Sequence, residues 1–135
     1  MLPLSEVQAA VYTALVPALA PVPVLDYAGP NQTYPYCTIG ELTAEHNDTL
    51  GEEGSALEVM VHLWSRQLGM LELQTMMAAA EAALHREKLT LSGALQCVAA
   101  VLEYSATLRD ADGVTRHGVM RFRVMVFEAA AVPLP

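Results

Sequence analysis

The sequence has few cysteines, and the two it has are far apart. Cys37 and Cys97 form no Cys-x-x-Cys pair and have no ligand pattern around them. A zinc site or a disulfide framework needs more, or closer, cysteines, so both are predicted to be reduced packing residues. A catalytic thiol would need an activating base, such as His62 or His117, close to it in space.

Long uncharged apolar runs are also missing. The most apolar stretches are interrupted by Glu6, Glu58, Glu81 and Glu103, so none reaches the roughly 18 residues that a membrane-spanning helix requires. The opening residues, MLPLSEVQ, lack the basic and apolar regions of a secretory signal. We therefore expect no membrane contact and a protein made and kept in the cytosol.

Basic side chains are scarce, with 7 Lys and Arg against 15 Asp and Glu and a formal net charge of -8. Tight general binding to phosphate backbones depends on clustered positive charge and is not expected. The chain has no Gly-rich phosphate loop, no Gly-x-Ser-x-Gly and no His-Glu-x-x-His, and His46, His62, His85 and His117 show no ligand spacing. Nothing in the sequence indicates catalytic residues, a metal or a cofactor.

Apolar residues, by contrast, make up 53% of the chain and charged residues only 16%. This composition argues against disorder, and 135 residues suffice for one core. We expect a single domain over residues 1–135, with part of the apolar surplus used as a subunit interface.

The first half of the chain predicts one helix and three strands. Leu4, Val7, Val11 and Leu15 share one helical face, which indicates a helix from about Ser5 to Val16. Ser5 and Gln8 are spaced as a capping box, and Pro17 is expected to break the helix. Prolines then limit VPVLDY to a short or edge strand, and YPYCTIGEL predicts a second strand. Alternation in SALEVMVHLWS predicts a third, with Leu57, Val59, Val61 and Leu63 on its apolar face and His62 and Trp64 on its mixed face.

Between the second and third strands lies an acidic segment, residues 43–54. It carries four carboxylates, two glycines and no basic residue, which is typical of a mobile, solvated loop. The alternative is an arm that becomes ordered only against a partner. Its acidic residues are Glu45, Asp48, Glu52 and Glu53.

The second half predicts a helix and a final hairpin. From Gln67 onward, Met70, Leu73, Met76, Met77, Ala80 and Leu84 form a helical stripe of core type. Two long strands follow at 95–110 and 115–129, and Asp112-Gly113 predicts the turn between them. In the first, Val98, Ala100, Leu102, Tyr104, Ala106 and Leu108 should share a face; in the second, Met120, Phe122, Val124 and Val126 should.

These elements predict an α+β fold in the order α-β-β-β-α-β-β, with two helices packed on a mostly antiparallel sheet. Residues 129–135 are expected to form a flexible tail.

The final hairpin, RDADGVTRHGVMRFRV, holds four of the seven basic side chains. It is not a calcium loop, because Thr115 and Arg121 occupy its sixth and twelfth positions counted from Asp110. Only Phe122 separates Arg121 from Arg123, which is too little aromatic surface for base stacking. Arg121 and Arg123 should lie opposite Phe122, beside His117 and Val119, and we expect them to meet the acidic segment of a neighbouring copy. The candidate interface residues are Arg116, His117, Arg121, Arg123, His62, Trp64, Glu45, Asp48, Glu52 and Glu53.

Four stretches in this order, AAVYTALV, PYCTIGE, VHLWSRQLGMLEL and RDADGVTRHGVMRFRV, resemble the tail terminator, or tail completion and head-tail joining, proteins of long-tailed phages and gene transfer agents. The resemblance spans nearly the whole chain. It departs from that pattern in the proline-rich residues 22–33 and in the tail from Ala130 to Pro135.

The resemblance implies a structural virion protein without enzymatic activity. It would be assembled in the host cytoplasm as a hexameric ring that caps the tail tube, docks on neck proteins and lets DNA pass without specific binding. An adaptor or stopper ring of the neck is the alternative in the same class. A small cytosolic binding module or enzyme is the alternative outside virions.

Overall fold

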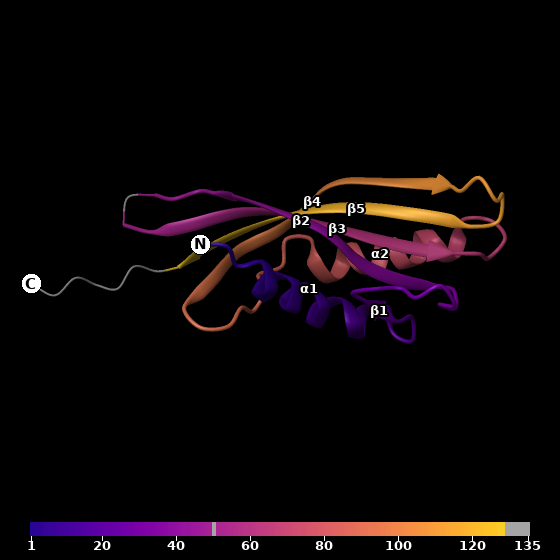
Figure 1. Ribbon diagram of the computed structural model, residues 1–135, viewed down its shortest axis with the longest axis horizontal. Coiled ribbons are helices and arrows are strands. Elements are labelled where there is room, and N and C mark those ends of the chain that lie inside the picture. Colours follow the sequence, from indigo (N-terminus) through magenta and orange to yellow (C-terminus); the bar gives the residue numbers. More distant parts are fainter. Residues whose placement is uncertain (50, 129–135) are drawn as a thin grey trace, which may run out of the picture.

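The computed structural model describes residues 1–49 and 51–128 and places two helices against one face of a five-stranded sheet (Figure 1). The predicted α+β fold and its element order are confirmed. The elements are α1 (Leu4–Leu19), β1 (Val24–Leu25), β2 (Tyr36–His46), β3 (Glu53–Ser65), α2 (Leu71–Leu84), β4 (Leu95–Arg109) and β5 (Arg116–Glu128). The predicted flexible tail at 129–135 lies outside the described residues.

The strands are ordered β1-β2-β3-β5-β4 across the sheet. Only β1 and β2 are parallel, and all other neighbours are antiparallel. The short β1 lies at one edge, as the surrounding prolines predicted, and the long β4 lies at the other. The two central strands, β3 and β5, therefore have a neighbour on both sides along their length.

The core lies between the sheet and the helices. The four apolar residues predicted for the inner face of β3 are fully buried, as are Phe122 and Val124 on β5. From the helices, Val7, Val11, Leu15, Leu73, Ala80 and Leu84 pack against this face. Burying a side chain of this size contributes about 1.5–3 kcal/mol, so this face supplies most of the driving force for folding.

Both helices differ from their predicted bounds. α1 continues through Pro17 to Leu19, because the buried Leu15 and Leu19 hold its last turn on the core although Pro17 cannot donate a helical hydrogen bond. The predicted capping box does not form: Pro3 is the N-cap, and the Ser5 hydroxyl donates to Glu6 instead. α2 begins at Leu71 rather than near Gln67. Neither helix is long and apolar enough to cross a membrane, as far as the described residues go.

Both ends of the predicted loop over 43–54 are strand, which corrects its bounds, since residues 43–46 belong to β2 and residues 53–54 to β3. β2 runs through His46 and β3 begins at Glu53, and Glu45 pairs with Ala56 across the ladder. The alternation of apolar and polar residues favours a strand here, because Leu42 and Ala44 pack toward the core while Glu45 is exposed to solvent. The result is a long hairpin that extends from one end of the sheet (Figure 1). We call residues 42–49 and 51–57 the acidic arm.

The prediction that alternate β4 residues from Val98 to Leu108 share one face is also wrong. Register shifts occur between Cys97 and Ala100 and between Leu102 and Tyr104. Each bulge moves the following side chains to the other face, so Cys97 and Ala100 are buried while Tyr104 is exposed. Val98 and Leu108 are exposed as well. A period-two pattern in the sequence does not reveal the extra residue that each bulge inserts.

Candidate subunit interface

The face of the sheet that the helices leave uncovered carries a stacked cluster of aromatic and imidazole rings. Trp64 on β3 and His117 on β5 are paired in register, and their rings lie parallel with centroids 3.7 Å apart. The imidazole of His62 lies beside them, with its Nδ1 2.8 Å from Nε2 of His117. Three of the residues that the sequence suggested for an interface therefore come together on one face.

The hydrogen bond between the two imidazoles needs one donor and one acceptor, so one of the facing nitrogens must be unprotonated. Burial, and then the charge of His62, lower the pKa of His117. Glu41 lies on the far side of His62, with its Oε2 3.4 Å from His62 Nε2. His62 thus lies between the Glu41 carboxylate and the His117 imidazole.

Gly40 makes room for this arrangement and was not recognised from the sequence. A Cβ at Gly40 would lie 2.7 Å from both Cδ2 and Nε2 of the His62 ring, so only glycine fits beneath the imidazole in this position. A glycine inside a strand often marks such a close approach. That signal was present in PYCTIGE.

Tyrosine side chains extend the cluster toward β2. Tyr36 stacks on Trp64 with ring centroids 6.0 Å apart, and its ring is tilted by 53° against that of Tyr34 at 5.1 Å. The Arg66 guanidinium lies 4.2 Å from the Tyr34 ring centroid. Burial raises the pKa of Tyr36 to about 12. The Trp64 Nε1 donor is buried without an acceptor among the described residues. A buried donor of this kind is usually satisfied by a partner group or by water.

Arg121 and Arg123 lie further along the same face and share one carboxylate. Glu103 on β4 lies 4.0 Å from Arg121 Nε and 3.9 Å from Arg123 Nη1. Arg123 also pairs in register with Glu58 on β3. The predicted face is thus confirmed, and Glu103 is an intramolecular partner that the sequence pattern did not reveal. Arg121 Nε is buried without a hydrogen bond within the described residues, whereas 52% of the Arg123 side chain is exposed and accessible to a neighbour.

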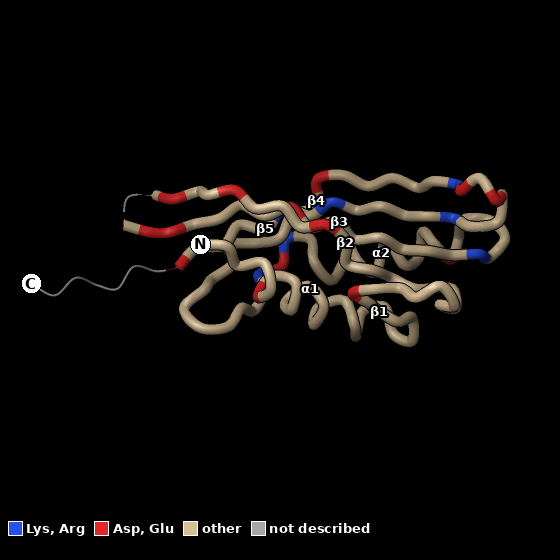
Figure 2. The backbone as a smooth tube through the Cα atoms, viewed as in Figure 1, with Lys and Arg blue, Asp and Glu red and all other residues tan. Residues whose placement is uncertain are grey.

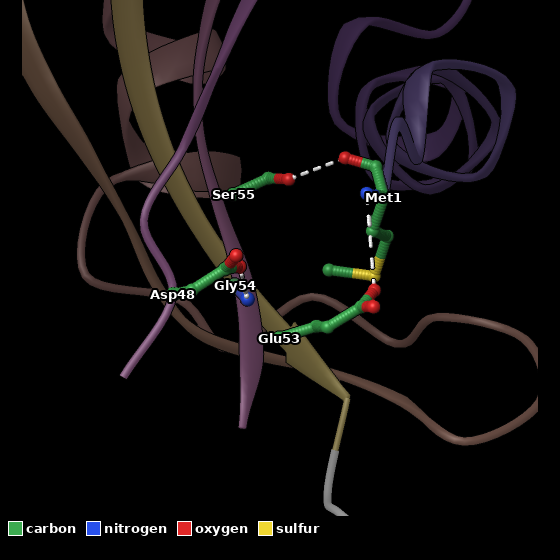
Figure 3. A network of polar contacts seen from close by, with 5 residues as sticks. All are labelled: Met1, Asp48, Glu53, Gly54 and Ser55. Carbon is green, nitrogen blue, oxygen red and sulfur yellow. Dashed lines mark hydrogen bonds and ion pairs between the residues drawn. The ribbon is translucent and has the colours of Figure 1, made fainter. Parts of the chain in front are cut away.

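The acidic arm carries Glu45, Asp48, Glu52 and Glu53, and its base is tied to the chain start (Figure 3). The Ser55 hydroxyl donates to the Met1 carbonyl at 2.8 Å, and the Met1 ammonium lies 3.8 Å from Glu53 Oε2. Asp48 accepts a hydrogen bond from the Gly54 N–H at 3.0 Å. Of these carboxylates, Asp48 and Glu53 have internal roles.

Gly54 is a second site of close approach. Its N–H contacts Asp48, its carbonyl accepts a hydrogen bond from the Asn47 N–H at 2.9 Å, and a Cβ at this position would overlap the Asn47 carbonyl oxygen. The arm can therefore close at this point only with glycine.

Arg116 lies apart from the ring cluster, at the β4–β5 turn, where it donates to the Val114 carbonyl. Asp112 organises this turn by accepting hydrogen bonds from the Val114 and Thr115 N–H groups and from the Thr115 hydroxyl. These bonds lower the pKa of Asp112 to about 2. Gly113 follows with a φ of 72°, which confirms the predicted Asp-Gly turn.

Charge is unevenly distributed along the molecule. Figure 2 shows acidic segments and no basic ones along the acidic arm, and it shows basic segments together with acidic ones at the opposite end, near the β4–β5 turn. The basic residues of that end are Arg66, Arg109 and Arg116. Of the two arginines that the sequence suggested should meet the acidic segment, Arg123 lies near Glu45 of its own chain, since both line one pocket together with Glu58 and Glu103.

The described residues bring no three His, Cys, Asp or Glu side chains together as a metal site. Cys37 is fully buried on the core side, where burial raises its pKa to about 12. Its neighbour in the ladder is Leu63, whereas His62 points to the opposite face. The histidines that could have activated a thiol therefore lie across the sheet from it.

The candidate interface is thus the free face of a half-covered sheet, with partly buried rings, two arginine side chains and an acidic arm at one end. The family model of Tail completion protein gp17 matches residues 7–126, and the chain belongs to this family. It is thus a structural protein of a phage-type tail or neck.

Among solved structures, the chain is similar to one from the "Virion of native gene transfer agent (GTA) particle". The TM-score is 0.79 at 18% sequence identity, and the match covers 91% of this chain and 96% of the other. This likeness shows a shared fold. No curated protein matched the chain.

Proposed function

We propose that this protein forms a hexameric ring that terminates the tail tube and joins the tail to the head or neck. The family match over residues 7–126 carries the proposal. The fold shared with a chain of a gene transfer agent virion supports it. The ring would be assembled in the cytoplasm of the bacterial host and retained in the virion.

The chemistry of the free surfaces supports a ring of identical subunits. A cyclic contact is heterologous, meaning that it joins two different surfaces of the same chain. The acidic arm and the basic groups near the β4–β5 turn are such a pair, because they lie in different parts of the subunit (Figure 2). Arg121, Arg123, His117, His62 and Trp64 would lie at or near this contact with Glu45 and Glu52 of the neighbour, and Arg116 with Asp48 and Glu53 would support it.

The net charge suits a channel for DNA. A formal charge of -8 repels phosphate and lets DNA slide without specific binding. The tail tube protein and the connector would dock on the two rims of the ring. The proposal involves no enzymatic step, cofactor or membrane.

Removal of the chain from a particle-producing cell tests this role. We expect filled heads and separate tails in electron micrographs, and tailed particles should return when the chain is supplied from a plasmid. Normal yields of tailed particles without the chain would overturn the proposal and favour a binding module or enzyme unrelated to virions.

The same preparation distinguishes a terminator from an adaptor or stopper. A terminator should copurify with isolated tails, whereas an adaptor or stopper should remain on filled heads. Immunoblots of the two fractions decide between them.

A further inference from the structure

The two outer edges of the sheet each leave a segment of backbone without a partner. We infer that neighbouring copies join edge to edge, β4 of one copy against β2 of the next, so that the ring contains one continuous antiparallel sheet. This inference rests on the proposed ring and assigns the surfaces that close it.

The first half of β4 shows which backbone groups point away from β5. The Ala100 N–H donates to the Glu87 carbonyl at 2.9 Å, and the Ala100 carbonyl accepts the Arg86 N–H at 2.7 Å. The Leu102 N–H donates outward to His85 Nδ1 at 2.9 Å. The residues that follow α2 thus cover this part of the edge.

The second half of β4 is uncovered. Ser105 pairs with Met120 and Thr107 with Gly118. Along β5, Met120 and Gly118 lie an even number of residues from Val124, the partner of Ala100. Because alternate residues of an antiparallel strand point the same way, the N–H and carbonyl groups of Ser105 and Thr107 face away from β5. Within residues 1–49 and 51–128 no strand pairs with them.

The opposite edge has a matching gap on β2. β1 covers only Cys37 and Thr38, and the Cys37 N–H donates outward to the Pro23 carbonyl at 2.9 Å. Beyond the bulge, Leu42 pairs with Val59 and Ala44 with Leu57. The same alternation leaves the backbone groups of Leu42 and Ala44 facing outward, without a strand partner in the described part of the chain.

The two free segments are compatible in direction and size. β2 and β4 run antiparallel to each other within one sheet, so a copy added in the same orientation places them as antiparallel neighbours. On the helix side, the short side chains of Ala44, Ser105 and Thr107 would lie together without crowding. The free half of β4 has no proline or lysine and only Glu103 and Arg109 as charges, so it lacks the usual protection of an edge strand.

Charge favours this pairing over its alternatives. The free segment of β2 belongs to the acidic arm, whereas the free segment of β4 ends at Arg109, beside Arg116 (Figure 2). Pairing of two β2 edges would bring acidic arms together. The free segments lie at opposite ends of the sheet, so closure requires strands tilted to the ring axis, as in closed barrels.

Proline at a free edge position tests the backbone contact. Thr107→Pro removes an outward N–H that no intramolecular ladder uses, so the subunit should stay folded by circular dichroism. The hexamer should fall at least tenfold at equal concentration in native mass spectrometry. Thr107→Ala, which keeps the N–H, should assemble like the wild type. A hexamer undiminished by Thr107→Pro would overturn the edge contact and leave the ring intact.

Thiol cross-linking identifies the partner strand. Chains with Ala44→Cys and chains with Thr107→Cys are mixed and treated in solution with a short bifunctional maleimide. Where the free chain is monomeric, the same treatment is applied to assembled particles that contain both variants. Cross-linked dimers should form only in the mixture, since Cys37 and Cys97 are buried. Dimers from Thr107→Cys alone would show a twofold β4 contact and overturn the inference. A wild-type chain absent from both oligomers and particles would overturn the proposed function itself.

Discussion

His62 Nδ1 lies 2.8 Å from His117 Nε2, and the two imidazoles come from neighbouring strands of the sheet. Glu41 adjoins the pair on the side of His62, and the parallel ring of Trp64 covers His117. The hydrogen bond is possible only while one of the facing nitrogens is unprotonated. We therefore expect acid to weaken this contact on the uncovered face of the sheet.

The folded state should lose stability as the pH falls below about 6.5, the ordinary histidine value. The pKa of His117 is lowered in the folded protein, so the unfolded chain takes up the proton more readily. The stability that neutral His117 contributes is present above the unfolded pKa and is lost as the pH falls through the lower pKa of the folded state. Urea unfolding between pH 7.5 and pH 5 measures this. His117→Gln should flatten the profile, and an equally steep profile in the variant would contradict the assignment.

Gly54→Ala should destabilise the protein by about 1–3 kcal/mol, the range for overpacking. The new Cβ would overlap the Asn47 carbonyl oxygen, and backbone cannot move aside as a flexible side chain can. Gly29→Ala is the matched control, because a Cβ there meets nothing within 4 Å. Chemical denaturation gives both values, and equal effects would refute the close approach at the base of the acidic arm.

Asp112 should titrate at a pH of about 2 in the folded protein, because its carboxylate accepts three hydrogen bonds at the β4–β5 turn. Carboxyl NMR chemical shifts followed through an acid titration check this value. The stability that the turn gains is present above the unfolded pKa of 3.8 and lost as the pH falls toward 2. A midpoint near 3.8 would show that the capping bonds do not form in solution.

Reversal of Arg121 and Arg123 to Glu should weaken assembly. Three acidic side chains would then meet at Glu103, and the donors offered to a neighbour would be lost. Arg86→Glu with Lys88→Glu makes the same change in net charge away from this face. Light scattering should show a smaller species for the first double variant only. An unchanged oligomer would exclude these arginines from the contact.

The order of elements was predictable because each element carries its own periodic pattern. The alternation through Leu57 and Leu63 and the helical stripe through Leu73 and Leu84 are both buried as the pattern predicts. Element ends were less predictable, since Pro17 is held in α1 by burial of its neighbours. The acidic charge around Glu45 led to the prediction of a loop, whereas Glu45 lies in a strand paired with β3.

The candidate site was predictable only in part. Arg121 and Arg123 lie on the predicted face, but their shared contact with Glu103 depends on a bulge in β4. The contact of His62 with His117 depends on the register of β3 against β5. Neither a bulge nor a register is encoded in a local pattern.

The sequence by itself determined the α+β class, the element order and the apolar faces of β3 and β5, because local periodicity and turn chemistry specify which side chains leave water. The tertiary structure alone decided which residues from distant strands meet and which edges of the sheet remain free. Those outcomes depend on long-range pairing and on two bulges in β4, each of which moves every following side chain to the opposite face.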